Sequence, residues 1–275
     1  MKDITIALVQ MESRFGRVQD NLAKMHKFIK DAAARGAEII CFPELCIHGY
    51  QRENVHSVAE AVPGESSRAV SRMARDEGLV VLAGMAEKSG LDKPYNTHLV
   101  AWPDGTVQSY RKTHLGESEK PYFTPAGEFP VYFTDKAGFA VEICWELHFP
   151  EITAILSLKG AEIIFAPHAS PTIVGDRRSI WLKYLAARAY DNSVFIASCN
   201  LVGKGSEKQS FCGGALVLDP KGNVVAEAFN GREELLVVPL DSKLINIIRR
   251  QKSESMRNSF FLKARRPELY KDLLK

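Results

Sequence analysis

Hydrophobic residues divide this chain into short strands and helices that alternate along most of its length. Apolar runs rich in Val, Ile and Phe are typical of buried strands, and apolar residues spaced three and four apart are typical of helices that bury one face. The pattern predicts helices at 18–33, 66–77, 151–159 and 180–188. It predicts strands at 4–9, 37–44, 79–87, 96–102, 106–111, 139–144, 161–168, 193–200, 214–218, 224–229 and 235–240. This alternation indicates an α/β fold.

Two segments of the chain resemble each other, ARGAEIICFPE at 34–44 and LKGAEIIFAPH at 158–168. Each consists of a helix end, a glycine and a buried strand, which predicts two related sheets within one domain rather than two separate domains. The repeat places Glu44 and His168 at equivalent strand ends. Because ligands of open α/β sheets bind at the carboxyl ends of the strands, this edge is a candidate site.

A cysteine lies where a predicted strand turns into a predicted helix, within residues 138–151. Cys144 ends the strand, Trp145 and Glu146 begin a tight turn, and Pro150 is placed to open the helix. A cysteine at such an elbow exposes its sulfur at a sheet edge, close to backbone N–H groups, which suits a nucleophile. The alternative is that Cys144 is a small buried hydrophobic residue, as most free cysteines are.

The composition is that of an ordinary globular protein of 275 residues, 45% hydrophobic and 25% charged, with a net charge of +3. No stretch approaches the roughly 20 apolar residues of a membrane span, and the first apolar run is too short for a signal peptide. Five cysteines without CxxC spacing predict reduced thiols in a cytoplasmic protein, rather than disulfides or a zinc site. The basic residues at 249–250 and 263–266 lack the interleaved aromatic residues of a nucleic-acid-binding module, so we expect no nucleic-acid partner.

Four polar residues lie at predicted strand ends or just beyond them: Glu44, Lys112, Glu119 and Cys144. Structural roles are the alternative, since Glu44 could be a solvated carboxylate, Lys112 an edge-strand charge and Glu119 loop surface. Together the four residues fit one reaction. A carboxylate can remove the proton of a thiol, and a lysine with the Trp145 backbone N–H can stabilise the negative charge formed when the thiolate attacks a carbonyl or nitrile carbon.

Three motifs that contain these residues are FPEL at 42–45, YRKTHL at 110–115 and EICWELHFPE at 142–151. In order and spacing they resemble the signatures of the carbon–nitrogen hydrolase, or nitrilase, superfamily. SEKPYFTPAG at 118–127 resembles the loop that carries the second glutamate of this family. The segments 185–200 and 265–270 also look like family segments, so the resemblance covers most of the chain.

The resemblance implies a four-layer α-β-β-α sandwich with residues 1–275 as a single domain, of which about 242–275 form a C-terminal extension. It implies Glu44 as general base, Lys112 as stabiliser of the oxyanion, Cys144 as nucleophile and Glu119 as accessory carboxylate. The implied reaction is acyl transfer through a Cys144 thioester or thioimidate, followed by hydrolysis, and it needs no metal or organic cofactor.

The residues after the cysteine bear on the substrate. True nitrilases usually continue with Trp-Glu-Asn, whereas here Leu147 takes the third place, and the next four residues are similar to the amidase and N-carbamoyl-amine hydrolase branches. We therefore expect a small amide or N-carbamoyl amine as substrate, with Trp145, Tyr50 and His168 in contact with it. The alternatives are a nitrilase and a catalytically silent binding protein of the same fold. Glu142 and the 176–178 loop receive no defined role.

The resemblance also implies a homodimer or a higher even homo-oligomer that pairs through helices beside the active-site layer. The helices near 151–159 and 177–190 carry more apolar surface than a helix facing one sheet requires. The apolar residues 260–262 and 269–270 of the tail have no obvious local partner, and such groups tend to find a neighbouring subunit.

Overall fold

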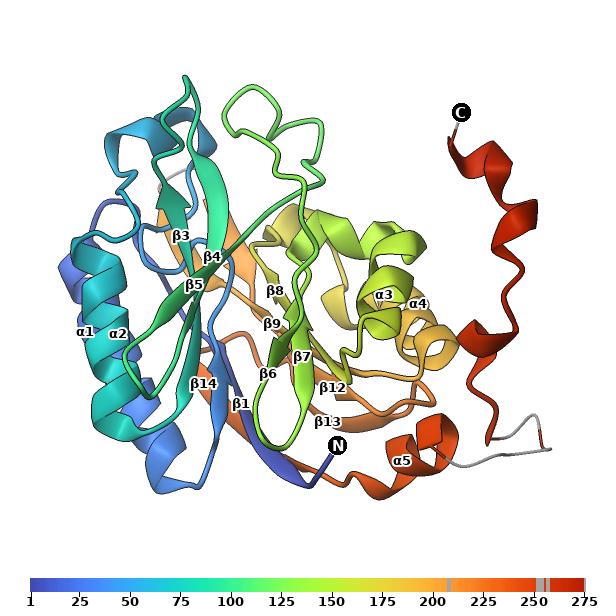
Figure 1. Cartoon of the computed structure of the whole chain (residues 1–275). Coiled ribbons are helices and arrows are strands. Elements are labelled where there is room, and N and C mark those ends of the chain that lie inside the picture. The colour runs from blue at the N-terminus through green and yellow to red at the C-terminus, as the bar shows by residue number, and fades with distance from the viewer. Residues whose placement is uncertain (207–208, 251–254, 256–257, 275) are drawn as a thin grey trace.

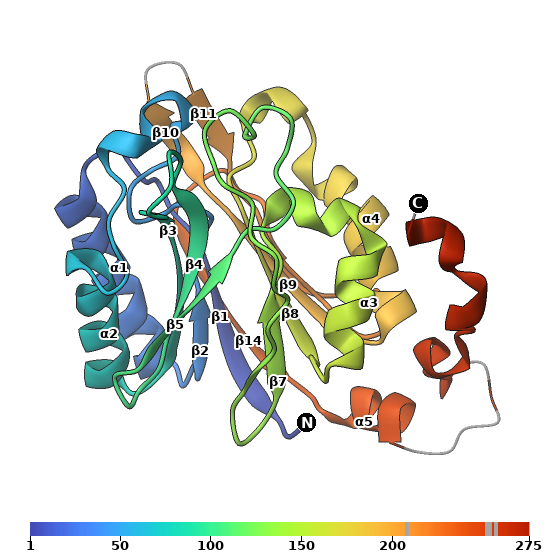
Figure 2. The same cartoon turned by 45° about the horizontal axis from the view of Figure 1, so that its top comes forward.

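Two six-stranded sheets lie face to face, with a pair of helices on each outer side (Figure 1). The structure is a computed structural model that describes residues 1–206, 209–250, 255 and 258–274. Helices α1 (Val18–Ala34) and α2 (Glu65–Glu77) cover the first sheet, and α3 (Pro150–Leu158) and α4 (Arg177–Asn192) cover the second (Figure 2). The expected four-layer α-β-β-α sandwich is therefore confirmed.

The two sheets have matching strand orders, β14-β1-β2-β3-β4-β5 and β6-β7-β8-β9-β12-β13. The first contains β1 (Ile4–Gln10), β2 (Ile39–Cys41), β3 (Val80–Glu87), β4 (Tyr95–Ala101), β5 (Val107–Arg111) and β14 (Glu234–Leu240). The second contains β6 (Tyr132–Phe133), β7 (Gly138–Val141), β8 (Ile163–His168), β9 (Phe195–Asn200), β12 (Ala215–Leu218) and β13 (Val224–Ala228). A separate hairpin joins β10 (Val202–Ser206) to β11 (Gln209–Cys212).

The internal repeat of the sequence corresponds to the centres of the two sheets. β2 pairs in parallel with β1 and β3, β8 pairs in parallel with β7 and β9, and the remaining strands of both sheets are antiparallel. Gly36 and Gly160, which end the helices before β2 and β8, have φ angles of 76° and 104°. Only glycine adopts this conformation at little cost, which explains why both repeats contain it. The predicted pair of related sheets is observed.

Apolar side chains from both sheets fill the space between them. Residues such as Ile6 and Leu8 of β1 meet Val141 and Phe165 of the second sheet in one buried cluster. Each sheet also shares one further apolar cluster with the helices that cover its outer face. Because the strands are buried on both faces, they read in the sequence as continuous apolar runs rather than as alternating ones.

Several elements differ from the predictions. β2 ends at Cys41 rather than at Glu44, because Pro43 has no N–H to continue the ladder. The sequence pattern missed the short strands β6, β10 and β11, and it missed helix α5 (Lys243–Arg250), which lies within the predicted C-terminal extension. Short 3₁₀ helices complete the chain: η1 (Arg52–Ser57), η2 (Cys144–His148), η3 (Thr172–Val174), η5 (Phe261–Ala264), η6 (Pro267–Leu269) and η7 (Lys271–Leu274).

The C-terminal segment passes along the outer side of α3 and α4 (Figure 1). The expectation that its first aromatic residues lack local partners is wrong: the Phe261 ring packs at a tilt against Tyr190 of α4, and Arg249 of α5 lies over the Phe260 ring. Farther along, Leu269 and Leu273 are exposed. Residues 251–254, 256–257 and 275 of the predicted extension lie outside the described residues. Among the described helices, none is long and apolar enough to cross a membrane.

Candidate active site

Glu44 lies in the turn that follows β2. The next residue, Leu45, has a left-handed backbone with φ 51°, which is uncommon for a residue other than glycine. Strand β3 passes so close that a Cβ atom at Gly84 would lie 2.3 Å from the Leu45 nitrogen. Glycine at this position therefore lets the turn pack against the sheet and hold the Glu44 side chain in the interior, where only 1% of its surface is exposed.

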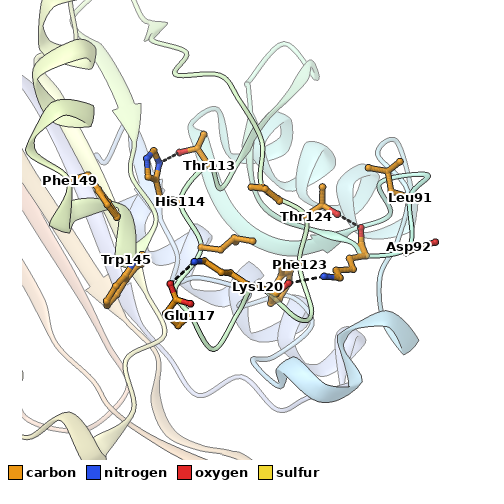
Figure 3. Close-up of a pocket in the computed structure, with 13 residues that line it drawn as sticks. Leu91, Asp92, Thr113, His114, Glu117, Lys120, Phe123, Thr124, Trp145 and Phe149 are labelled. Carbon is orange, nitrogen blue, oxygen red and sulfur yellow. Dashed lines mark hydrogen bonds and ion pairs between the residues drawn. The ribbon is translucent and has the colours of Figure 1, made fainter. Parts of the chain in front are cut away.

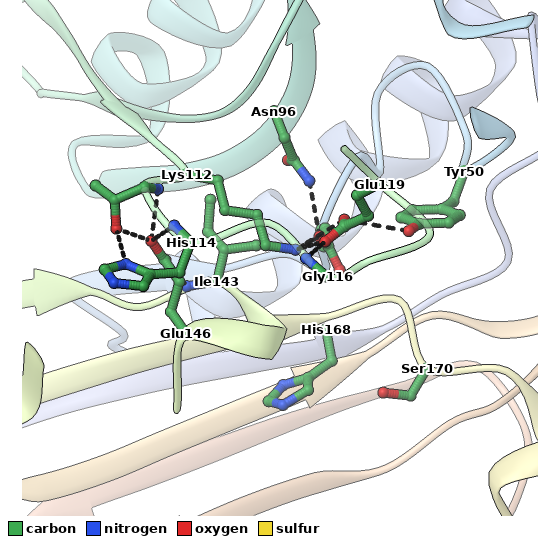
Figure 4. Close-up of polar contacts among 12 residues, drawn as sticks. Tyr50, Asn96, Lys112, His114, Gly116, Glu119, Ile143, Glu146, His168 and Ser170 are labelled. Carbon is green, nitrogen blue, oxygen red and sulfur yellow. Dashed lines mark hydrogen bonds and ion pairs between the residues drawn. The ribbon is translucent and has the colours of Figure 1, made fainter. Parts of the chain in front are cut away.

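Lys112 lies between two buried carboxylates (Figure 4). Its Nζ atom is 2.8 Å from Oε1 of Glu44, and 2.8 and 2.9 Å from the two carboxylate oxygens of Glu119. All three side chains are buried, with Glu44 in the turn after β2 and Lys112 and Glu119 in the loop between β5 and β6. The structure thus brings together three of the four residues selected from the sequence.

The charges of this cluster explain its protonation. Burial disfavours the charged form of Lys112, but Glu44 and Glu119 outweigh it and hold the lysine pKa well above its ordinary value. Burial raises the pKa of Glu44 above its ordinary value, although the Lys112 ammonium opposes this shift. Lys112 is therefore charged at neutral pH, and Glu44 is a stronger base than a solvated glutamate.

Cys144 begins the 3₁₀ helix η2, three residues beyond the end of β7. It has a left-handed backbone with φ 49°, as Leu45 has in the turn of Glu44. The side chain is partly exposed. Burial raises the pKa of the thiol to about 12, the Glu44 carboxylate raises it as well, and Lys112 opposes them. The sulfur therefore lies within the field of the other three residues and is a protonated thiol in the resting state.

Glu119 is held from two further sides. The Tyr50 hydroxyl donates a hydrogen bond to its Oε1 (3.2 Å), and the backbone N–H of Gly116 donates to its Oε2 (2.8 Å). Tyr50 is buried, and among the described residues of the cluster it forms a hydrogen bond with Glu119 alone. Its expected contact with substrate stays a prediction, whereas its role in orienting Glu119 is visible in the structure.

Asn96 belongs to the site and was missed in the sequence. Its Nδ2 atom donates a 2.7 Å hydrogen bond to Oε1 of Glu44, and its backbone carbonyl accepts from the Lys112 N–H at 2.8 Å. Asn96 lies on β4, and no local pattern distinguishes it from the strand residues around it. Its proximity to Glu44 depends on the pairing of β4 with β3, which the sequence does not encode locally.

Glu146 joins the turn of Cys144 to the loop that carries Lys112. Its Oε2 accepts from the Ile143 N–H (2.6 Å), and its Oε1 accepts from the Tyr110 hydroxyl (2.6 Å) and from the N–H and hydroxyl of Thr113 (both 2.7 Å). The residue is completely buried. The sequence placed Glu146 in the tight turn after Cys144 without a partner, and the structure shows that it joins this turn to the loop of Lys112.

Trp145 lies at the edge of a cavity of about 840 Å³ (Figure 3). Phe149 lines the same side, and Leu91 and Thr124 line the opposite side. The indole is 42% exposed and packs against Gly116, where a Cβ atom would be 3.7 Å away. None of the described residues that line this cavity is Glu44, Lys112 or Cys144. The cavity therefore borders the cysteine turn through Trp145 and does not include the cluster of Glu44 and Lys112.

His168, the last residue of β8, lies across from Lys112 and Glu119 (Figure 4). Its Nδ1 is 2.8 Å from the carbonyl oxygen of Ala166, and its ring centre is 4.8 Å from that of Trp181. Burial holds the pKa of His168 well below its ordinary value, so the imidazole is neutral at pH 7. The two residues at equivalent positions of the sequence repeat, Glu44 and His168, thus lie on the same side of the molecule, with the Lys112 cluster in common.

The two features without a defined role are now placed. Glu142 is buried, donates its backbone N–H to the Phe165 carbonyl and accepts a 3.1 Å hydrogen bond from Thr153 of α3. Burial raises the pKa of Glu142 to about 8. In the 176–178 loop, Asp176 caps α4 by accepting from the Ser179 N–H. Among the described residues, no group of three or more His, Cys, Asp or Glu side chains is arranged to hold a metal ion.

Comparison with known proteins identifies the family. A sequence model of carbon–nitrogen hydrolases matches residues 5–250. The chain belongs to the carbon–nitrogen hydrolase family. It is 34% identical to a nitrilase of Pyrococcus abyssi, over 97% of this chain and 99% of the relative. It is 32% identical to an N-carbamoylputrescine amidase of Arabidopsis thaliana (94% and 91%) and 32% identical to an omega-amidase of Xenopus laevis (84% and 87%).

Solved structures agree with this carbon–nitrogen hydrolase assignment. An amidase of Nesterenkonia sp. has a TM-score of 0.85 and 27% identity, with 98% of this chain and 99% of that chain covered. A variant of that amidase carries the acetamide moiety of fluoroacetamide covalently on its active-site cysteine, at a TM-score of 0.85 and 26% identity, with 98% and 97% covered. These matches confirm the expected superfamily, fold and enzyme class.

Proposed function

We propose that this carbon–nitrogen hydrolase cleaves the C–N bond of a small amide or N-carbamoyl amine through a thioester on Cys144. The observation that carries the proposal is the Lys112 ammonium, held 2.8 Å from both Glu44 and Glu119 beside a partly exposed cysteine. Two buried carboxylates and one ammonium leave the site with an excess negative charge, so the thiol does not ionise by itself. It needs a base at the moment of attack, and Glu44 is the base at hand.

The reaction follows from these protonation states. Glu44 takes the thiol proton while the sulfur attacks the carbonyl carbon, and the developing oxyanion is stabilised by Lys112 and by the backbone N–H of Trp145 in the first turn of η2. Glu44 then gives its proton to the departing ammonia or amine, which leaves the acyl group on Cys144. Water attacks the thioester, Glu44 removes a proton from that water, and the acid and the free thiol are released. Glu119 keeps Lys112 charged and in position.

The relatives support an amide bond as the target. Two of those described above are named amidases, and the cysteine-to-alanine variant of the Nesterenkonia amidase was solved with butyramide. A panel of aliphatic amides, N-carbamoyl amines and nitriles, assayed for release of ammonia or amine, tests the proposal. We expect turnover of at least one amide or N-carbamoyl amine, and failure on every member of both classes would contradict it.

Nitrile hydrolysis is a second candidate, because the Pyrococcus abyssi relative is named a nitrilase. A nitrilase would convert a nitrile to the acid through a thioimidate, with the same three residues. Product analysis on a nitrile and on its amide separates the two candidates. Our proposal expects the amide to be hydrolysed much faster than the nitrile.

The hydrogen bond from Asn96 to Glu44 leads to a prediction for the pH dependence. Glu44 must be deprotonated to act as base, so kcat/KM should fall as the pH drops below its pKa, which lies above the ordinary value for glutamate. Asn96→Ala removes a donor to the charged form and should raise this pKa. A hydrogen bond to a charged group contributes about 1.5–3 kcal/mol, so the acid limb should move up by roughly one to two pH units.

The matched control for this prediction is Thr97→Val. Thr97 is the neighbour of Asn96 on β4, and its hydroxyl donates to a different buried carboxylate, that of Glu87 (2.7 Å). The control should leave the acid limb in place even if it costs stability. An unshifted acid limb in Asn96→Ala would mean that Glu44 is not the group whose ionisation limits the rate.

We also propose that the protein forms a homodimer or a higher even oligomer through α3, α4 and the C-terminal segment. Ile155 and Leu158 of α3 and Tyr190 of α4 are exposed. The C-terminal segment runs along the outer side of these two helices (Figure 1). Sedimentation equilibrium at micromolar concentration should give about twice 30.6 kDa or an even multiple of it. Leu158→Lys should lower this mass, whereas the control Val225→Lys, on β13, should not. A wild-type mass near 30.6 kDa would exclude the proposal.

A further inference from the structure

Arg177 is a buried cation without an anionic partner. It is the first residue of α4 and only 8% of its surface is exposed. Its Nε has no hydrogen-bond partner, and no carboxylate lies within ion-pair distance of its guanidinium among the described residues. Buried charges are rarely left unpaired, because removing a cation from water costs several kcal/mol unless an anion compensates it. The absence of an anion beside Arg177, among the described residues, therefore needs an explanation.

The groups around Arg177 connect it to the reaction centre. Tyr184 lies on the same helix, with its hydroxyl 3.4 Å from Nε2 of His168 and its ring centre 4.7 Å from that of His148. Burial raises the pKa of the Tyr184 hydroxyl, negative charge on Cys144 adds to this, and Arg177 opposes it. Arg177 precedes Tyr184 by seven residues, about two turns, and therefore lies on the same face of α4. His148 is exposed and Tyr184 is half-buried, so this region opens to solvent beside the cysteine turn.

None of these neighbours supplies a negative charge. Nδ1 of His168 faces the Ala166 carbonyl, a pure acceptor, so Nδ1 carries the proton and Nε2 accepts from the Tyr184 hydroxyl. Glu44 and Glu119 are both held by Lys112. The donors of Arg177 thus meet neutral groups in the resting enzyme, on the face of α4 that also carries Tyr184.

We infer that Arg177 binds a carboxylate of the substrate, so that the preferred substrates are acidic amides or acidic N-carbamoyl compounds rather than neutral ones. This inference rests on the proposed amide hydrolysis and specifies its substrate class. A guanidinium presents several N–H donors in one plane and matches the two oxygens of a carboxylate. The carboxylate could be on the acyl chain, as in the monoamide of a short dicarboxylic acid, or on the amine side, as in an N-carbamoyl amino acid.

Two pairs of compounds that differ only in this group test the inference. Succinamate and butyramide share their chain length and place the carboxylate on the acyl side. N-Carbamoyl-β-alanine is paired in the same way with the neutral N-propylurea and places the carboxylate on the amine side. For at least one pair, we expect wild-type kcat/KM to be about 10- to 100-fold higher for the acid, the scale of one hydrogen-bonded charge pair. The pair that shows the preference identifies the side of the scissile bond that faces Arg177.

Arg177→Gln should abolish the preference by lowering kcat/KM for the acid alone, while the rate on the neutral partner stays within a few-fold. The matched control is Arg178→Gln. Arg178 has the same charge and the next place on α4, but it is exposed and forms a 2.7 Å ion pair with Glu227. The control should keep the preference of the wild type. Equal losses on both members of a pair in Arg177→Gln would show a purely structural role and overturn the inference.

Inhibition of the wild type gives a test that needs no substitution. Succinate should compete with butyramide hydrolysis at much lower concentration than butyrate does, if the carboxylate of an acyl chain reaches Arg177. For the amine side, inhibition by derivatives of β-alanine is compared with inhibition by the corresponding derivatives of propylamine. An enzyme that hydrolyses neutral amides but shows no acid preference in either pair and no stronger inhibition by the acids contradicts this inference alone. An enzyme that hydrolyses none of the four compounds, nor any other amide, contradicts the proposed function itself.

Discussion

Cys144→Ala should abolish amide hydrolysis, with a loss of about 10⁴–10⁶-fold in kcat, because only the thiolate can form the covalent intermediate. The fold should survive. Alanine keeps the Cβ atom, so the left-handed backbone at this position, φ 49°, is no more strained than in the wild type. The Glu146 hydrogen bonds that hold the elbow involve the backbone of Ile143 and not the thiol. Initial rates on the best amide, together with thermal melting, check both halves of the prediction.

Cys212→Ala is the control for this substitution. Cys212 is another partly exposed cysteine, and its sulfur contacts Asn200 at 3.2 Å rather than the Glu44–Lys112 cluster. It should retain nearly full activity. A Cys144→Ala enzyme that turns over amide at more than a few per cent of the wild-type rate would rule out Cys144 as the nucleophile.

Glu44→Gln and Lys112→Ala should each lower kcat by about 10²–10³-fold or more. Glutamine keeps the shape of Glu44 but cannot accept the thiol proton, and alanine removes the charge that stabilises the oxyanion. The two substitutions should differ in stability. Lys112→Ala leaves two buried carboxylates without a cation and should destabilise the fold by about 3–5 kcal/mol, whereas Glu44→Gln leaves Lys112 paired with Glu119.

Two neighbouring surface residues provide controls for these variants. Lys120 and Glu117 form an exposed ion pair in the same loop as Glu119. Lys120→Ala and Glu117→Gln should therefore change kcat by less than about twofold, since exposed pairs contribute little. Steady-state kinetics of all four variants, at a temperature where each is folded, shows whether Glu44 and Lys112 are needed for turnover. Near-normal kcat in Glu44→Gln would show that Glu44 is not the base, whatever the kcat of Lys112→Ala.

The sequence predicted the framework of the molecule well because buried strands and amphipathic helices leave a local pattern. The repeat at 34–44 and 158–168 gave the relation between the two sheets. Its glycines, Gly36 and Gly160, both have the positive φ that the repeat required. The end of β2 was misplaced because apolar character continues to Glu44 while the hydrogen-bond ladder stops before Pro43.

The site was predictable only where a motif carries its own chemistry. Lys112 and Cys144 stand out as a cation and a thiol beyond the ends of apolar strands. Asn96 and Glu146 do not, since each acts through contacts with residues far away in the sequence. Their roles depend on strand pairing and helix packing, and no local spacing of residue types announces them.

The C-terminal segment was underestimated for a different reason. α5 has only eight residues, and its buried positions Ile245 and Ile248 form a stripe too short to stand out against the basic residues around it. Tertiary contacts hold α5 in place: Arg249 donates to the Ser193 carbonyl (2.9 Å) and to the Ser157 hydroxyl (2.8 Å). Arg249, one of the basic residues of this segment, thus fixes the helix to the body of the protein.

The central claim is that the acyl group passes through Cys144, and the most direct test is to trap it there. The wild-type enzyme is mixed with a slowly hydrolysed amide, quenched in acid within one turnover, and analysed by intact-protein mass spectrometry and peptide mapping. The account predicts a mass increase equal to the acyl group, located on the peptide that contains Cys144 and absent from Cys144→Ala. An adduct that persists in Cys144→Ala, or that maps to another residue in the wild type, would contradict it.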